Sequence, residues 1–490
     1  MRIPTKEEIH AVYEQGEAAV VALVIGIVEA QNKQVEAVEA RIEALEGQQK
    51  KNSGNSSQPP SSDGYKKPQP KSERERSGKK SGGQAGHEGQ TLKAVAVPDD
   101  MVVHPVTACA HCQADLRAVK SNEPEKRQVF EVPPVVLVVT EHQAEEKQCP
   151  QCGKTNRAPF PTGVTQPTQY GPRFRAQLVY LHTGHFIPLA RTAEIAEGFY
   201  QQPVSEGTIL AAVAEAAQQV APVNEALKTY LVETDDTVHA DETGARVEGK
   251  LHWVHSAGTT QATVYSIQAK RGCEGIDAAN ILNRRHKRCI HDAWQSYFNY
   301  KAMAHALCNA HHLRELTFIA EQYHQQWAIA MRHLLCEIKT AVEKASAEGR
   351  QALRLEQMAD FNRHYTRLLD AAEDEIGPPA PPTPGHRQKN SPPARLFKRL
   401  IDYRQHVLAF MYDFRIPFDN NLAERDVRMM KVQQKVSGGF RRLVGAQHFC
   451  AVRSYIATAR KNGQSILEVL TQALAGDPYY PPCTIPSTPE

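Results

Sequence analysis

Three acidic residues lie in segments that a fold could bring to a single metal site. Asp241 belongs to a predicted strand (HADETG), Asp292 ends another (CIHDAWQSY), and Glu424 lies near the start of a predicted helix (PFDNNLAERDVRMMK). Carboxylate oxygens suit Mg²⁺, and a pair of such ions can activate an attacking oxygen while stabilising the leaving oxygen of a phosphodiester. Simpler roles are also open: a solvated strand end for Asp241, a helix N-cap for Asp292, and an ion pair with Arg428 for Glu424.

Two Cys-x2-Cys pairs predict a second, structural metal site. Four thiolates complete a closed tetrahedral Zn²⁺ site with no position left for water. The 36 residues between the pairs contain two apolar runs, 129–132 and 135–139, which are predicted strands, so the whole is typical of a zinc ribbon. A nearby histidine could replace one thiolate. The predicted ligands are Cys109, Cys112, Cys149 and Cys152, and the alternative histidines are His104, His111 and His142.

The acidic residues require a sheet to position them. Three short strands are predicted at 238–247, 251–256 and 262–267, followed by a helix at 275–285, a strand at 288–292, a short helix and an apolar segment at 306–308. The predicted order is therefore β-β-β-α-β-α-β. Helix then dominates from 311 to 375, a proline-rich break follows at 377–393, and helices resume at 394.

A short coiled-coil seam is predicted near the N-terminus, where apolar residues recur at spacings of three and four. An amphipathic helix packed on the body of the protein is the alternative, but the polar run that follows isolates the helix and favours self-association. That run is a predicted disordered linker with a basic cluster suited to loose phosphate contact or to simple solvation. The seam consists of Val21, Val24, Val28, Gln31, Val35, Val38, Ile42 and Leu45.

A helix-turn-helix is predicted in the segment after the cysteines. One helical pattern contains Ile195 and Phe199, the other contains Ile209 and Val213, and Ser205 could cap the second helix. Packed helix pairs are common in any helical segment, so DNA recognition by the second helix is only one of two interpretations.

Composition and charge exclude several classes of protein. The 490 residues contain 58 basic and 55 acidic side chains and are 41% hydrophobic, which excludes a fibrous or wholly disordered chain. The apolar run from Val20 to Val28 is short for a membrane span, and the first residues lack the features of a secretory signal. We therefore expect no membrane contact and a cytoplasmic location. Ten cysteines do not form a disulfide framework in a chain of this length.

Basic residues gather near the C-terminus. Between Ala394 and Lys461 there are 14 Lys or Arg against 5 Asp or Glu, an excess of 9 that predicts contact with a polyanion. Four of them follow Glu424 at helical spacing and could align DNA phosphates beside the metals, although a solvated helix face would look the same. These predicted DNA-binding residues are Arg425, Arg428, Lys431 and Lys435.

The order of several motifs resembles the insertion sequence 66 family of bacterial DDE transposases. They are DETG, HDAWQSY, CNAHHLREL, DFRIPFDNNLAERDVRMMKVQQKVSGGFR and YIATARKNG, preceded by the KNSGNSSQPPSSDG linker and the two Cys-x2-Cys pairs. The resemblance implies an RNase H-like core in which Asp241, Asp292 and Glu424 form the DDE triad with Mg²⁺ or Mn²⁺. It implies cleavage of element ends by water and direct attack of the freed 3′-hydroxyl on target DNA. Cys308-x2-His311 matches a signature of several such families and serves positioning equally well without metal.

The predicted fold is multidomain α+β, an RNase H-like core with a helical insertion. The resemblance also implies DNA as a partner, a homo-oligomer, small element-encoded accessory proteins and a place with the bacterial nucleoid. Two alternatives are a catalytically silent DNA-binding regulator, disfavoured because all three acidic residues are present, and a two-metal nuclease that does not join DNA. The predicted segments are a coiled-coil helix (1–50), a linker (51–95), a zinc ribbon (96–160), a helical DNA-binding segment (161–235), the first part of the core (236–312), the insertion (313–412), the completion of the core (413–475) and a disordered tail (476–490).

Overall fold

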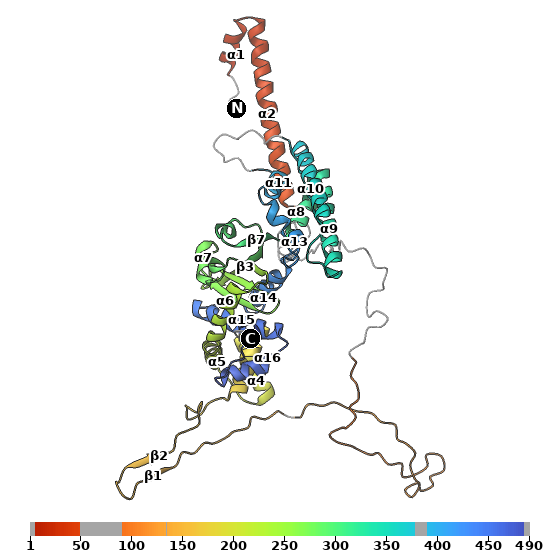
Figure 1. Ribbon diagram of the computed structural model, residues 1–490, viewed down its shortest axis with the longest axis vertical. Helices are drawn as coiled ribbons and strands as arrows, with labels where there is room; N and C mark the ends of the chain where they lie inside the picture. The colour runs from red at the N-terminus through yellow and green to blue at the C-terminus, as the bar shows by residue number, and fades with distance from the viewer. Residues whose placement is uncertain (1–4, 50–90, 134, 378–389, 485–490) are drawn as a thin grey trace. The chain divides into compact units, whose positions relative to one another are not determined.

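The computed structural model describes residues 5–49, 91–133, 135–377 and 390–484 (Figure 1). The chain folds into two compact units. Of the described residues, the first contains 5–49, 161–194, 204–377 and 390–484, and the second contains 91–133, 135–160 and 195–203. We call the described part of 71–160 the cysteine unit. Most of the predicted linker at 51–95 lies outside the described residues.

A five-stranded mixed sheet forms the centre of the first unit. Its strands are β3 (Val238–Val247), β4 (Lys250–Gly258), β5 (Thr263–Gln268), β6 (Arg288–His291) and β7 (Ala304–Leu307), in the spatial order β5-β4-β3-β6-β7. The three consecutive strands pair antiparallel, whereas β6 and β7 run parallel to β3. This arrangement confirms the predicted strand order and is consistent with an RNase H-like core.

Helices cover both faces of this sheet because successive β3 side chains point to opposite sides. Ala245 and Val247 pack with residues of α14 (Asn421–Ser437) and α15 (Leu443–Lys461). Val238 and Ala240 pack on the other face, which α7 (Cys273–Ala279) helps to cover. Two short 3₁₀ turns, η3 (Leu282–Arg284) and η4 (Gln295–Asn299), flank β6 in the sequence.

The predicted helical insertion is present and packs on the parallel edge of the sheet. Its apolar core includes Ile290, Ala306 and Leu307 from β6 and β7 together with Trp327 from the insertion. Figure 1 shows α9 and α10 side by side in this region. The proline-rich residues 378–389 lie outside the described residues. The helices are α8 (Asn309–Tyr323), α9 (Gln326–Ala347), α10 (Leu355–Ile376), α11 (Pro392–Asp402), α12 (Arg404–Val407) and α13 (Ala409–Tyr412).

A helical layer precedes the sheet in the sequence and packs with the C-terminal helices. Ser205 caps α5 by accepting a hydrogen bond from the Thr208 amide at 3.1 Å, as predicted. Helix α5 packs against α3, α15 and α16 through Ile209, Val213 and neighbouring alanines. The elements before the sheet are α3 (Pro172–Val179), the π-helical turn η2 (Tyr180–Gly184), α4 (Leu189–Tyr200), α5 (Glu206–Gln219) and α6 (Ala221–Glu233). The C-terminal helix α16 (Ile466–Leu474) packs against α3 and α5.

The prediction of a disordered tail from residue 476 is wrong for its first nine residues. Residues 476–484 follow the core and end in the 3₁₀ turn η5 (Pro482–Thr484), which contacts α6. The Tyr479 amide donates a hydrogen bond to the hydroxyl oxygen of Tyr455 at 2.8 Å, and Tyr479 and Cys483 pack on the apolar core. Five prolines predicted disorder, but two aromatic side chains fix the segment.

Two N-terminal helices are described, α1 (Lys6–Tyr13) and α2 (Glu17–Gln49). A capping box between Thr5 and Glu8 begins α1. The stretch Glu17–Val35 of α2 has a mean hydropathy of 1.3 and is wholly exposed, so by length and composition it could cross a membrane. The sequence-based prediction counted only the run to Val28 and therefore judged this helix too short. One such helix near an N-terminus is weak evidence, and the absence of membrane contact stays a prediction.

The cysteine unit contains one short antiparallel pair, β1 (Glu146–Gln148) with β2 (Thr155–Arg157). The predicted strands at 129–132 and 135–139 are not present among the described residues, and Val129, Val138 and Val139 are 88–90% exposed. Valine-rich runs favour strands only where a neighbouring strand supplies hydrogen bonds and a packing surface. In this stretch a long-range link joins Val95 to the Gln128 side chain instead, at 2.8 Å in both directions.

Candidate active site and cysteine turns

Asp241 and Asp292 lie opposite each other in the register of two adjacent parallel strands, β3 and β6. Val238 pairs with Cys289 and His239 with Ile290, so continuing the register places Asp241 opposite Asp292, one residue beyond the end of β6. Neighbouring strands lie about 4.8 Å apart, which brings two carboxylates with the same register close together. Asp292 Oδ1 also accepts a hydrogen bond from the Trp294 amide at 2.9 Å, so the capping role considered for it is present as well.

The two carboxylates are held in a repulsive environment. Burial raises the pKa of Asp241 well above its usual range, with further increases from the negative charges of Glu242, Asp292 and Glu424. Burial and the charge of Glu242 raise the pKa of Asp292 to about 6, although Arg271 and Arg399 oppose the increase. The charge of Glu424 is the smallest of these contributions to the raised pKa of Asp241.

Asn420 fixes the start of α14 against the sheet, and thereby positions Glu424 in the first turn. Its side-chain amide donates to Ala240 O at 2.8 Å and accepts from His239 Nδ1 at 2.8 Å. Its backbone amide donates to Cys308 Sγ at 3.1 Å. Three fixed contacts leave α14 little freedom to slide along β3.

Glu424 is half-buried and faces Arg314 and His311 of α8. Its Oε1 lies 3.5 Å from Arg314 Nη2 and 3.7 Å from His311 Nε2. Among the described residues Arg428, the partner considered from spacing, forms no ion pair with it. Burial and the two arginines Arg314 and Arg399 lower the pKa of His311 to about 3, so its ring is neutral here.

Cys308 and His311 act mainly as positioning groups in this arrangement. Cys308 follows β7 and accepts the Asn420 amide through sulfur, and His311 lies in the first turn of α8. The three atoms of Cys308, His311 and Glu424 that could bind a metal lie within 4.8 Å of one another. Arg314 shares Glu424 with them, however, and adds a positive charge that opposes a cation at this point.

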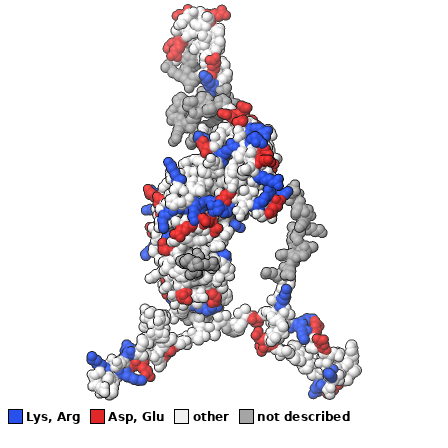
Figure 2. All heavy atoms as spheres, in the orientation of Figure 1, with Lys and Arg blue, Asp and Glu red and all other residues white. Residues whose placement is uncertain are grey.

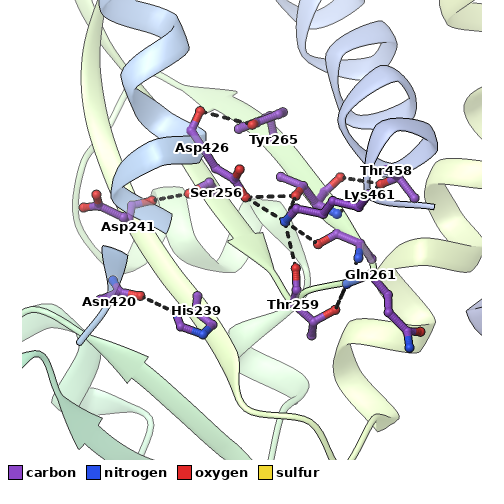
Figure 3. A network of polar contacts seen from close by, with 12 residues as sticks. His239, Asp241, Ser256, Thr259, Gln261, Tyr265, Asn420, Asp426, Thr458 and Lys461 are labelled. Carbon is purple, nitrogen blue, oxygen red and sulfur yellow. Dashed lines mark hydrogen bonds and ion pairs between the residues drawn. The ribbon is translucent and has the colours of Figure 1, made fainter. Parts of the chain in front are cut away.

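A separate polar network occupies Asp426, a neighbouring carboxylate that could otherwise replace Glu424 as a ligand. Figure 3 shows Asp426 beside Lys461, with Asp426 Oδ2 2.9 Å from Lys461 Nζ and 2.9 Å from Thr263 Oγ1. The Tyr265 hydroxyl donates to Asp426 O at 3.1 Å. Asp426 thus ties α14 to β5 and α15. Asp419 is another carboxylate near the start of α14. Its side chain accepts a hydrogen bond from the Asn421 amide at 3.1 Å and closes the turn before the helix.

Sequence reasoning missed the buried acid next to Asp241. Glu242 has a side chain only 1% exposed and binds Arg271 Nη2 at 2.7 Å and the Tyr297 hydroxyl at 2.5 Å. Glu242 was visible only as part of the DETG motif. Nothing in the spacing of Arg271 and Tyr297 from Glu242, 29 and 55 residues, showed that they meet.

The four predicted DNA-binding residues all lie on α14 but differ in exposure. Arg425, Arg428 and Lys435 are exposed on α14, whereas Lys431 is half-buried and donates to Gly244 O at 3.2 Å. Figure 2 shows basic and acidic side chains mixed across the same band of the face in view. Helix α5, the candidate recognition helix, contains no Lys or Arg at all. Its sequence therefore offers no cation for phosphate contact, and its DNA-binding role stays a prediction.

The two Cys-x2-Cys pairs form turns of the same design. Cys109 N–H donates to Ala114 O at 2.9 Å and Cys149 N–H to Lys154 O at 2.9 Å, while each cysteine carbonyl accepts an amide four residues on. Hydrogen bonds from the backbones of Cys112 and Cys152 lead the effects that lower the pKa of Cys109 and Cys149 respectively, which favours the thiolates that Zn²⁺ requires. Among the described residues the four sulfurs do not come together as one group.

The carboxylates fit a divalent cation pair on chemical grounds. They offer hard oxygen ligands, and burial, followed by repulsion between negative charges, raises the pKa of Asp241 and Asp292, a combination that bound dications relieve. Each cysteine turn likewise offers two ligands of the type that suits Zn²⁺.

Comparison with protein families gives three matches. Residues 167–448 match the family described as Transposase IS66 family, residues 107–153 match the zinc-finger binding domain of transposase IS66, and residues 1–93 match a family of unknown function, DUF6444. No curated protein matches the chain. The first match covers more than half of the residues, including Asp241, Asp292 and Glu424.

Proposed function

Because the chain belongs to the IS66 family of DDE transposases, which are polynucleotidyl transferases, and carries that family's zinc-finger domain, we propose that it cuts the ends of its own insertion sequence and joins them to target DNA. The observation that carries this proposal is the register that places Asp241 opposite Asp292 on adjacent parallel strands, with Glu424 in the first turn of a helix that Asn420 holds against β3.

Asp241, Asp292 and Glu424 are the proposed ligands of the catalytic metals, Mg²⁺ or Mn²⁺. When bound, a pair of such cations supplies activation of the attacking oxygen and stabilisation of the leaving oxygen. The chain's own part is orientation. Asn420 holds α14 on β3, and the Trp294 amide holds Asp292 Oδ1, so the carboxylates are fixed before DNA arrives.

The remaining parts of the chain are assigned by their chemistry. The four cysteines Cys109, Cys112, Cys149 and Cys152 hold one structural Zn²⁺, and the unit they close helps to bind DNA ends. Exposed Arg425, Arg428 and Lys435 contact phosphates next to the active site, which fixes DNA without reading its sequence. The apolar stripe of α2 pairs with a second copy of the chain, which brings two ends together. Small accessory proteins encoded by the element are possible further partners.

A strand-transfer assay tests the catalytic assignment. The substrates are labelled duplexes of the element's own ends with a supercoiled target, in Mg²⁺ or Mn²⁺. Asp241→Asn, Asp292→Asn and Glu424→Gln each remove one charge at nearly constant volume, and each should lower cleavage and joining roughly a thousandfold, the equivalent of several kcal/mol of transition-state stabilisation. DNA binding in a gel shift should be retained.

Exposed Glu274 on α7 supplies the matched control, because Glu274→Gln also removes one carboxylate charge but leaves the site intact. Wild-type-like joining by Glu424→Gln alone would transfer its role to Asp419. Binding without cleavage by the wild-type chain would show a catalytically silent regulator, and cleavage without joining would show a two-metal nuclease.

A further inference from the structure

An ion pair between the partly exposed Arg271 and the buried Glu242 lies next to the two aspartates of the proposed active site. Arg271, in the loop after β5, donates from both Nε (2.9 Å) and Nη2 (2.7 Å) to Glu242 Oε1. The second carboxylate oxygen of Glu242 accepts from the Tyr297 hydroxyl at 2.5 Å. Both oxygens of a nearly inaccessible carboxylate are thus satisfied, so Glu242 is fixed in one position.

Two tryptophans hold the guanidinium of Arg271. Its central carbon lies 4.8 Å from the ring centroid of Trp253 on β4 and 4.3 Å from that of Trp294, which follows β6. Contacts of this kind are attractive and stronger when partly shielded from water. Arg271 therefore connects β3, β4 and the segment after β6.

These contacts close a loop that includes both aspartates. The Glu242 amide donates to Asp241 Oδ1 at 2.9 Å, and the Trp294 amide donates to Asp292 Oδ1 at 2.9 Å. Arg271 bonds to Glu242 at one end and stacks on Trp294 at the other. Each aspartate is thus held by the backbone amide of a residue whose side chain binds the same guanidinium.

We propose that Arg271 is a positioning residue that sets the spacing of Asp241 and Asp292 through Glu242 and Trp294. This inference rests on the proposed role of the two aspartates as metal ligands. Arg271 has no part in the chemistry itself. Groups that orient metal ligands from the second layer matter because a catalytic arrangement tolerates displacements of only about 0.5 Å.

The flat, delocalised cation suits this position better than a lysine would. A guanidinium can lie between two rings and still donate along its edge to a carboxylate, whereas an ammonium has neither the plane nor the fork. Arg271 is also the cation paired directly with the buried carboxylate of Glu242, whose charge repels those of Asp241 and Asp292. Arg271 can therefore act in two ways: it can neutralise the charge of Glu242, and it can fix the spacing of Asp241 and Asp292.

Binding of Mn²⁺ to the full-length chain is the direct measurement. Free Mn²⁺ is followed by its electron paramagnetic resonance signal, with the protein bound to a precleaved terminal duplex that ends in a 3′-dideoxynucleotide and so cannot be joined. Arg271→Ala should weaken Mn²⁺ affinity roughly 10–100-fold, the range typical of lost second-layer partners, and Arg271→Lys should fall between Arg271→Ala and wild type. The control Arg284→Ala removes an exposed arginine of the same region and should leave the affinity unchanged.

The double variant Glu242→Gln with Arg271→Ala separates positioning from neutralisation. It removes the stranded buried charge together with its partner, so folding is protected while the bridge to Trp294 is still lost. Positioning predicts weak Mn²⁺ binding in this variant too. Wild-type affinity in the double variant, or in a folded Arg271→Ala protein, overturns the proposal.

Asp241→Asn in the same Mn²⁺ titration distinguishes the proposed role of Asp241 as a metal ligand from the proposed positioning role of Arg271. Weaker Mn²⁺ binding by Asp241→Asn with unchanged binding by Arg271→Ala contradicts only the role of Arg271. Unchanged binding by Asp241→Asn contradicts the proposed metal ligand itself.

Discussion

Asp241 and Asp292 stand on adjacent strands of a sheet covered by helices on both faces, whereas the four cysteines lie in two turns of a segment whose side chains are mostly exposed. In the core, contacts that orient the ligands join distant parts of the chain: Asn420, before α14, bonds to Ala240 of β3, and Arg271, after β5, bonds to Glu242 of β3. In the cysteine unit, each turn is closed by hydrogen bonds within six residues.

The two regions differ in whether the chain can stabilise its metal ligands without the metal. The core buries enough apolar surface to fix carboxylates that repel one another. The cysteine unit has a two-stranded pair of three residues per strand and no comparable apolar cluster among its described residues. Small units of this kind usually take their folding free energy from the metal. We therefore expect zinc to be part of the fold in one region, and divalent cations to be additions to a finished fold in the other.

Removal of zinc should produce the largest effect. Structural Zn²⁺ contributes on the order of 10 kcal/mol at neutral pH in small zinc domains, so Cys149→Ser or chelation should unfold residues 91–160. Limited proteolysis followed by mass spectrometry should then show cleavage within this range, and metal analysis should show the loss of one zinc per chain.

The melting temperature of the core should not change when zinc is removed. Cys336→Ser, which changes a half-buried cysteine of α9, is the matched control and should retain zinc. Equal protease resistance of Cys149→Ser and wild type, or purified protein without zinc, would contradict the metal dependence of the cysteine unit. A large fall in the melting temperature of the core would contradict the independence of the two regions.

Loss of Arg285 should be the next largest effect and should be confined to the core. Arg285 is 1% exposed and donates to backbone carbonyls of Leu231, Thr234, Asp236 and Arg288, joining the end of α6 to β6. Each buried acceptor left without a donor costs about 1–3 kcal/mol, so Arg285→Ala should lower the free energy of unfolding by at least about 3 kcal/mol.

Chemical denaturation monitored by circular dichroism measures this change. The neighbouring Arg284→Ala, at an exposed position, should change stability by less than about 0.5 kcal/mol. Zinc content should be the same in both variants. A parallel loss of zinc in Arg285→Ala would mean that the cysteine unit depends on the core.

The same contrast explains what the sequence could predict. Strands 238–247 and 288–291 were predictable because each is a short segment next to turn residues and each becomes a largely buried strand of the sheet. Asp241, Asp292 and Glu424 were recognisable by the motifs around them. The strands predicted at 129–139 failed because their valines have no partner strand. The link from Glu242 to Arg271 was not predictable, because it depends on the sheet bringing together residues distant in sequence. Tyr479 was missed because its packing on the core has no local pattern.

The N-terminal helix α2 is a second segment whose apolar side chains are left exposed by the rest of the chain. Val35 and Val38 of α2 are 50% and 51% exposed although they lie on an apolar stripe of a continuous helix. If a second chain covers this stripe, Val35→Asp with Val38→Asp should cost about 3 kcal/mol of association, at roughly 1.5 kcal/mol per valine, and more from charge repulsion. Sedimentation should show a smaller oligomer, with the core melting temperature unchanged.

Glu29 and Lys33, which are exposed on the same helix, offer a control pair whose exchange preserves net charge. An unchanged oligomeric state after the valine substitutions would show that α2 has another partner, and binding of the wild-type helix to lipid vesicles would identify a membrane as that partner.

The smallest expected effect is the pH dependence of stabilisation by Mg²⁺. Burial raises the pKa of Asp292 to about 6, against about 3.9 in an unfolded chain, so the metal-free folded state binds more protons between these values. Its stability therefore falls as pH rises through about 6, by at most about 1.4 kcal/mol per pH unit for this one group. Mg²⁺ requires the deprotonated carboxylates and should offset that loss only above this pH. The Mg²⁺-induced rise in the melting temperature of the zinc-loaded chain should accordingly grow from pH 5 to pH 8 and should be largely absent in Asp292→Asn. A rise independent of pH would mean that Mg²⁺ binds elsewhere, and the two regions would then differ less in their use of metal than the structure indicates.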